Sequence, residues 1–299
     1  MEIKQSLPVG VIYLIIELVL SFFIASIVKL LEPNIPIFQI LFYRYLLSLP
    51  LLMIYGFAKY GFRILKVNNI RLLLLRIICG FLGLAMWFLA IAKIDISLAT
   101  VLLNTMPLFI TILSVLIVRE SVGLRRSIAV IVGFFGVFFI ILPINASFNF
   151  VGVVCALLGA IFAGLMFVFI RMLGKTNASI PTAIWYNSFG VVVSGMILFF
   201  SEYYLNNNSI SLFHKDLPWR YLLALGLLAS FQQFCLAESH RYADASALAP
   251  FHYLAIPMGG AFGVILFNET ITIKFIIGAL IIVASNYYIL IREKAHSQI

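Results

Sequence analysis

The chain has 299 residues, of which 64% are hydrophobic and only 10% are charged. In a soluble domain about a quarter of the residues are charged, so this composition excludes a soluble globular protein and indicates a polytopic membrane protein. The net charge of +9 does not indicate nucleic-acid binding, because basic residues gather beside the cytoplasmic ends of membrane helices.

Continuous apolar segments follow one another along the chain, each close to the ~20 residues that a helix needs to cross a bilayer. They lack the alternating polarity of β-barrel strands, so we expect an all-α protein with ten transmembrane helices. An N-terminus inside the cell places most basic loop residues in the cytoplasm, which predicts a multi-pass protein of the bacterial inner (plasma) membrane with both termini cytoplasmic. The segments cover residues 9–30, 36–56, 72–93, 98–118, 127–143, 151–171, 181–201, 219–240, 246–267 and 273–291.

Two ionisable residues lie deep in the first two segments. Glu17 and Arg44 each lie about 12 Å from an opposite edge of the membrane, at a rise of about 1.5 Å per residue. Charged groups at this depth are costly and indicate a functional site; the alternative is a static structural pair. Arg44 is predicted to bind a substrate carboxylate through its planar guanidinium. Glu17 is predicted to bind a substrate cation or to carry a proton.

Proline interrupts the fourth and the ninth segments near mid-membrane. Pro107 and Pro257 each deprive the carbonyl four residues earlier of its helical donor, and a carbonyl freed in this way is tolerated where it lines a wet cavity. Paired interruptions in corresponding helices indicate the binding site of a transporter, although a purely structural kink is the alternative. Polar or aromatic residues accompany both prolines: Asn104 in one segment, His252 and Tyr253 in the other.

Further candidate residues come from the remaining segments. Aromatic side chains are predicted to wall a planar or cationic ligand, and amides in the seventh and eighth segments are predicted to face the same cavity. The candidates are Tyr43, Trp87, Tyr186, Asn187, Gln232 and Gln233.

The two halves of the chain resemble each other. The segment beginning "VGVIYLIIELVLSFF" at Val9 corresponds to "VGVVCALLGAIFAGL" at Val151, and Asp95, Ser97 and Glu120 correspond to Asp244, Ser246 and Glu269 at a constant offset of 149. We therefore predict two five-helix repeats, residues 1–148 and 149–299. Because five is an odd number, the second repeat enters the membrane from the opposite side, which predicts an inverted repeat around a central cavity that operates by alternating access.

These features resemble the drug/metabolite transporter superfamily, and within it the ten-helix EamA family. The resemblance rests on the tandem repeat, the Asp-x-Ser…Pro…Glu pattern of each half and "FYRYLLSLPLL" in the second segment. It implies a carrier fold without an ATPase domain. The segment "ALAPFHYLAIPMGGAFGVILFNE" is similar to a branch of metabolite importers that includes S-adenosylmethionine carriers, which have a basic residue where His252 stands.

The resulting hypothesis is a secondary transporter for a small polar organic metabolite, such as an amino acid or a derivative of the S-adenosylmethionine kind. An exporter of amino acids or other metabolites and a carrier for riboflavin-like or nucleotide-like compounds are the alternatives, and an intramembrane enzyme or a structural membrane protein would be a different class. We expect no cofactor, because the three cysteines and four histidines form no metal-binding pattern. The expected partners are the substrate, the lipid bilayer, and a proton or an exchanged metabolite, in a monomer or homodimer.

Overall fold

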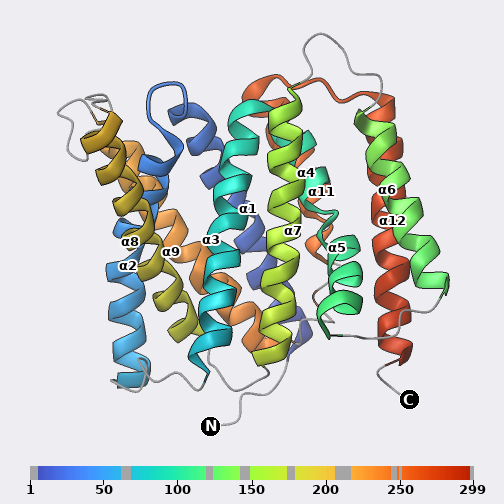
Figure 1. Cartoon of the computed structure of the whole chain (residues 1–299), viewed down its shortest axis with the longest axis horizontal. Coiled ribbons are helices and arrows are strands. Elements are labelled where there is room, and N and C mark those ends of the chain that lie inside the picture. The colour runs from blue at the N-terminus through green and yellow to red at the C-terminus, as the bar shows by residue number, and fades with distance from the viewer. Residues whose placement is uncertain are drawn as a thin grey trace.

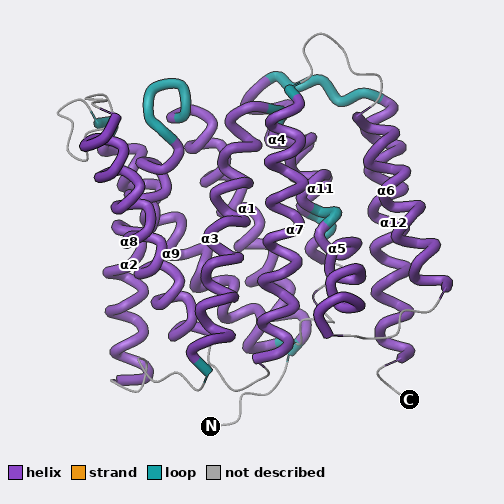
Figure 2. Tube along the Cα trace, in the orientation of Figure 1, coloured by secondary structure: helices purple, strands orange, loops and turns teal. Residues whose placement is uncertain are grey.

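The structure, a computed structural model, describes residues 6–61, 69–118, 124–141, 149–173, 179–205, 217–243, 248 and 251–296. Within these residues every regular element is a helix, and the helices stand side by side in one bundle (Figures 1 and 2). They are α1 Leu7–Leu31, α2 Ile37–Tyr60, α3 Ile70–Lys93, α4 Ile96–Leu103, α5 Met106–Leu113, the π-helix η2 Ser114–Val118, α6 Leu124–Ile141, α7 Phe150–Leu173, α8 Ser179–Leu205, α9 Trp219–Tyr242, α11 Ala255–Phe267 and α12 Ile273–His296.

The helices confirm the predicted membrane-spanning character of the chain. Within the part of the chain that the structure describes, seven helical segments are long and apolar enough to cross a bilayer, and three shorter apolar helices, within α6, α11 and α12, occupy the predicted fifth, ninth and tenth positions. Residues 244–247, where the predicted ninth segment begins, lie outside the described residues, as does Glu120 in the loop after the fourth segment.

Both predicted proline interruptions coincide with breaks between helices. A turn at Asn104–Thr105 separates α4 from α5, and a turn at Tyr253–Leu254 precedes α11. Each proline therefore lies in the first turn of a new helix, where its missing N–H costs no hydrogen bond. The prolines begin new helices and do not bend continuous ones.

Contacts between the two halves follow the symmetry expected of an inverted repeat. The most extensive contacts are those of α3 with α7, the third and sixth segments, and of α1 with α9, the first and eighth. The repeat makes these two pairs equivalent to each other. Three further contacts join equivalent segments directly, α2 with α8, α6 with α12, and α4 with α11, while α2 with α9 and α5 with α7 join segments that are not equivalent. Every one of these pairs joins the first half to the second, so the two halves interleave within one bundle.

Small residues allow the central helices to approach closely. A Cβ added at Gly83 of α3 would lie 3.3 Å from the backbone nitrogen of Ala163 in α7, and one added at Gly259 of α11 would lie 2.8 Å from Thr100 Oγ1 in α4. Side chains there would force the backbones apart. The glycines of these segments serve helix packing.

The connections between α3 and α4 and between α11 and α12 lie at one end of the bundle, and α1 begins and α12 ends at the other (Figure 1). We call the end that carries the α3–α4 and α11–α12 connections the distal end. An even number of crossings returns the chain to the side on which it began, which agrees with termini on one side of the membrane.

Candidate substrate site

A chain of polar side chains joins α1, α9 and α2 in the middle of the bundle. Gln232 of α9 donates from Nε2 to Glu17 Oε1 (2.8 Å) and accepts from Arg44 Nη2 at its Oε1 (3.4 Å). Ser21, one helical turn after Glu17, donates to the same carboxylate oxygen (2.9 Å). The structure thus brings together three of the predicted residues, Glu17, Arg44 and Gln232, with one neutral amide between the two charges.

Arg44 is nearly inaccessible, at 2% relative exposure, yet much of its hydrogen-bonding capacity is unused. Its Nε and Nη1 atoms are buried and have no hydrogen-bond partner among the described residues. Unused donors on a buried guanidinium are costly. The unused Nε and Nη1 lie on opposite sides of Nη2, and each can donate to a carboxylate on its own edge of the guanidinium, where Nη2 is the second donor. Arg44 is therefore a buried cation with unused hydrogen-bond donors.

Two tyrosines extend this polar chain toward α8 and α3. The Arg44 guanidinium lies 5.1 Å from the centre of the Tyr45 ring, and the Tyr45 hydroxyl is 2.8 Å from the hydroxyl of Tyr186. Tyr186 also donates to the carbonyl of Gly80 (3.3 Å). The predicted Tyr186 therefore reaches Arg44 through Tyr45, which the sequence interpretation missed, as it missed Ser21. Ser21 could have been found from its helical spacing of four residues from Glu17.

Other predicted site residues lie elsewhere. Tyr43 is buried against Trp219, with ring centres 5.3 Å apart. Asn187 is fully buried, accepts from Ser48 Oγ (2.8 Å) and donates to the Ala183 carbonyl (2.7 Å), so it joins α8 to α2. Three candidates are half-buried and take no part in the Arg44–Gln232–Glu17 chain: Trp87, Gln233 and His252.

The break between α4 and α5 carries its own polar contacts. Asn104 donates to the Thr100 carbonyl (2.8 Å), and its own carbonyl accepts from Asn286 Nδ2 of α12 (2.7 Å). Asn286 is 1% exposed. In the ninth segment, Tyr253 and His252 are half-buried beside the second break.

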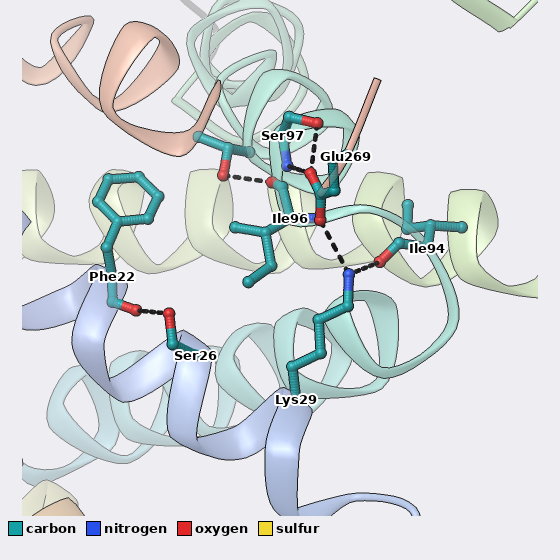
Figure 3. A network of polar contacts seen from close by, with 8 residues as sticks. Phe22, Ser26, Lys29, Ile94, Ile96, Ser97 and Glu269 are labelled. Atoms are coloured by element: carbon teal, nitrogen blue, oxygen red, sulfur yellow. Dashed lines mark hydrogen bonds and ion pairs between the residues drawn. The ribbon is translucent and has the colours of Figure 1, made fainter. Parts of the chain in front are cut away.

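A second polar cluster lies at the distal end, where Lys29, Glu269 and the first residues of α4 meet (Figure 3). Glu269 Oε1 accepts from Lys29 Nζ (2.9 Å) and from the Ile96 N–H (2.7 Å), and Oε2 accepts from the N–H (3.0 Å) and hydroxyl (2.7 Å) of Ser97. Lys29 also donates to the Ile94 carbonyl (3.2 Å). The sequence interpretation uses Ser97 and Glu269 only as markers of the repeat, and their recurrence was the signal that could have identified them.

The charge of Glu269 is held by these donors. Burial by itself raises the pKa of this carboxyl, but the hydrogen bonds from Ser97, Lys29 and the Ile96 N–H outweigh burial and hold its pKa below the usual range. Glu269 is therefore an ionised, fully bonded carboxylate. Among the described residues, no three His, Cys, Asp or Glu side chains lie close enough together to hold a metal ion.

An apolar helical bundle with interleaved halves is the architecture of a polytopic membrane protein, and internal repeats of this kind are common among transporters. The sequence profile of the EamA-like transporter family matches residues 8–142 and again residues 150–291, and the chain belongs to this family. It is thus a small-molecule transporter and not an enzyme, and the resemblance noted from the sequence is confirmed.

Individual relatives cover most of the chain. It is 26% identical over 290 residues to the S-adenosylmethionine uptake transporter of Rickettsia prowazekii (strain Madrid E), a match that covers 95% of this chain and 93% of the relative. It is 28% identical over 217 residues to a riboflavin transporter of Vibrio cholerae, covering 72% and 70%. A solved crystal structure superposes with a TM-score of 0.61 at 14% identity, over 95% of this chain and 97% of the other, and shares the fold.

Proposed function

We propose that the chain is a secondary active transporter that moves an amino acid or an amino-acid derivative, with S-adenosylmethionine as the leading candidate, across the bacterial inner membrane by alternating access. Both termini are cytoplasmic in this proposal, so the distal end faces away from the cytoplasm. Arg44 binds the substrate carboxylate, and Glu17 with Gln232 binds its cationic group. Tyr45 and Tyr186 provide aromatic surface beside Arg44.

The observation that carries the proposal is the unused hydrogen-bonding capacity of Arg44, at Nε and Nη1, beside the Glu17–Gln232 pair. A zwitterionic substrate would fill it, because such a molecule supplies an anion for Arg44 and a cation for Glu17 at once. The site contains no direct ion pair between these two residues that a substrate would first have to break. Gln232 keeps the two charges apart while it bonds to both.

Relatives support a metabolite substrate but differ in which one. S-adenosylmethionine has a carboxylate, an ammonium, a sulfonium and an adenine ring, and therefore matches both charged groups and the tyrosines. Riboflavin, which a similar Vibrio cholerae protein is named for, has a large planar ring but no carboxylate. The pairing of Tyr45 with Tyr186 favours riboflavin as the second candidate.

Counterflow in proteoliposomes tests the proposal. Vesicles that contain the purified protein and an excess of unlabelled S-adenosylmethionine should accumulate the labelled compound without an ion gradient. Unlabelled S-adenosylmethionine added outside should suppress this accumulation more strongly than riboflavin does. If only labelled riboflavin accumulates, riboflavin and not S-adenosylmethionine is the substrate. If only neutral or acidic amino acids accumulate, the site does not bind a sulfonium.

Removing the guanidinium tests the site itself. Arg44→Ala should abolish counterflow, because each lost charge-assisted hydrogen bond is worth about 1.5–3 kcal/mol and the substrate carboxylate would lose two. Arg220→Ala is the matched control, since Arg220 is exposed at the start of α9 and lies over the ring of Tyr221. Wild-type counterflow by a folded Arg44→Ala protein would remove Arg44 from the site.

A further inference from the structure

The first turn of α4 is capped by a residue of the other half of the chain. The Ile96 and Ser97 N–H groups, which have no partners within the helix, both donate to the carboxylate of Glu269. Glu269 lies in the connection between α11 and α12, more than 170 residues away in the sequence. A carboxylate at a helix N-terminus is favourable because it meets free N–H groups and the positive end of the helix dipole.

The residue that would normally cap α4 leaves that position unused. Asp95 occupies the N-cap position with the extended backbone typical of an N-cap residue (φ −61°, ψ 141°), yet its side chain makes no capping hydrogen bond. Aspartate is among the best residues for this position, where its carboxylate accepts from the second or third N–H of the helix. The second N–H of α4 belongs to Ser97 and already donates to Glu269. Two carboxylates are thus available for one helix N-terminus.

Lys29 and the α11–α12 connection hold Glu269 in this position. The side chain of Glu269 is 2% exposed, and the Lys29 ion pair joins it to the end of α1. Asn268 adopts the left-handed conformation (φ 52°) and turns the chain back, so that the Glu269 N–H donates to the Gly263 carbonyl (3.1 Å). The Glu269 carboxylate lies against Gly263, where any larger residue would collide with it. Four residues therefore join α1, α4 and the α11–α12 connection at the distal end. We call them the distal clasp: Glu269, Lys29, Ile96 and Ser97.

The other end of α4 is also held by the second half. The Asn104 carbonyl, just after the last residue of α4, accepts from Asn286 of α12. The eight residues of α4 are bounded by two contacts from the opposite repeat, with a break in the helix at the second.

We propose that the distal clasp is the gate at the distal end of the transporter, and that it opens by exchange of the α4 cap from Glu269 to Asp95. In the state seen here Glu269 caps α4 and draws the α11–α12 connection against α1 and α4. When Glu269 and Lys29 separate, the carboxylate of Asp95 takes the Ser97 N–H, so the helix never has an uncapped end. The exchange keeps the two states close in free energy, as an element with two stable arrangements requires. The inference rests on alternating access, which is part of the proposed function.

Labelling of a buried position tests the gate without a substrate. Thr100 is 2% exposed and faces α11 beside Gly259. A Thr100→Cys protein in vesicles should react slowly with a membrane-impermeant maleimide added at the distal side, and the chain without this substitution measures the background from its three buried cysteines. Asp95→Ala should slow the labelling by roughly five-fold, the ratio that corresponds to the loss of one helix cap. Glu269→Gln should accelerate it.

The conservative variant separates capping from charge. Asparagine caps helices about as well as aspartate, so Asp95→Asn should restore the labelling rate that Asp95→Ala loses. Equal slowing by Asp95→Asn and Asp95→Ala, or no effect of either, would overturn the cap exchange. Slower labelling after Glu269→Gln would show that the clasp does not close this end.

The same variants in counterflow distinguish this inference from the proposed function. If labelling responds as expected while S-adenosylmethionine is not transported, the gate stands and the substrate is wrong. If S-adenosylmethionine is transported at equal rates by the wild-type, Asp95→Ala and Glu269→Gln proteins, and their labelling rates are equal too, the proposed function stands and the gate is wrong.

Discussion

Gln232 keeps two buried charges from pairing directly. A guanidinium and a carboxylate in direct contact would satisfy each other and bind a substrate weakly, whereas the amide bonds to both and leaves the Nε and Nη1 donors of Arg44 unused. The equivalent of Glu17 in the second half is Gly159, which packs against α3. The carboxylate is thus an addition to the repeat and not a requirement of helix packing.

Neutralising Glu17 should weaken binding of a cationic substrate. Glu17→Gln keeps the size of the side chain but removes its charge, so we expect the KM for S-adenosylmethionine in proteoliposome uptake to rise at least ten-fold, in keeping with the ~1.5–3 kcal/mol of a charge-assisted hydrogen bond. Glu238→Gln is the matched control, because Glu238 is also a buried glutamate and accepts from Tyr55 at the far end of α9. An unchanged KM in Glu17→Gln would exclude the cation-binding role.

Helix breaks belong to the element scale, and this part of the fold could be predicted from the sequence. Proline lacks an N–H wherever it stands, so Pro107 and Pro257 are sufficient to indicate where α5 and α11 begin. The capping of α4 by Glu269 could not be predicted in this way, because it depends on how the α11–α12 connection folds back over the bundle. Likewise the depth of Glu17 and Arg44 followed from helix rise, but their link through Gln232 depends on the packing of α1 and α2 against α9.

The α11 helix must keep a glycine where the distal clasp touches it. A Cβ at Gly263 would meet the Glu269 carboxylate itself, so Gly263→Ala should displace that side chain. We expect a loss of about 1–3 kcal/mol in the free energy of unfolding, despite the gain in helix propensity of almost 1 kcal/mol. Thermal unfolding in detergent measures this change.

Gly164→Ala provides the matched substitution in another helix. A Cβ at this position would lie 3.5 Å from Ile110 Cγ1, an ordinary van der Waals contact. This variant should unfold at or slightly above the wild-type temperature. If Gly263→Ala were as stable as Gly164→Ala, the close packing of Glu269 against α11 would be wrong.

At the scale of the whole molecule, the distal clasp joins both halves, so its charge state contributes to global stability. Two charged groups pair there, Glu269 from the α11–α12 connection and Lys29 from α1, and Asp95 stands at the N-cap of α4. The hydrogen bonds of the clasp hold the pKa of Glu269 below its usual value, against the opposing effect of burial. The folded protein therefore binds fewer protons at this site than the unfolded chain does, and stability rises with pH through the range in which the group titrates.

The stabilisation by Glu269 should therefore be fully present above the ordinary glutamate pKa of ~4.3 and disappear as the pH falls through the lower pKa of the folded state. At pH 7, Glu269→Gln should unfold more easily than the wild type by about 1.5–3 kcal/mol, the worth of hydrogen bonds to a charged group. Unfolding of both proteins in detergent between pH 7 and pH 3 measures the difference, which should shrink toward zero at the acid end because protonation then removes the same charge from the wild type. A difference that stayed constant across this range would mean that the Glu269 charge does not hold the two halves together.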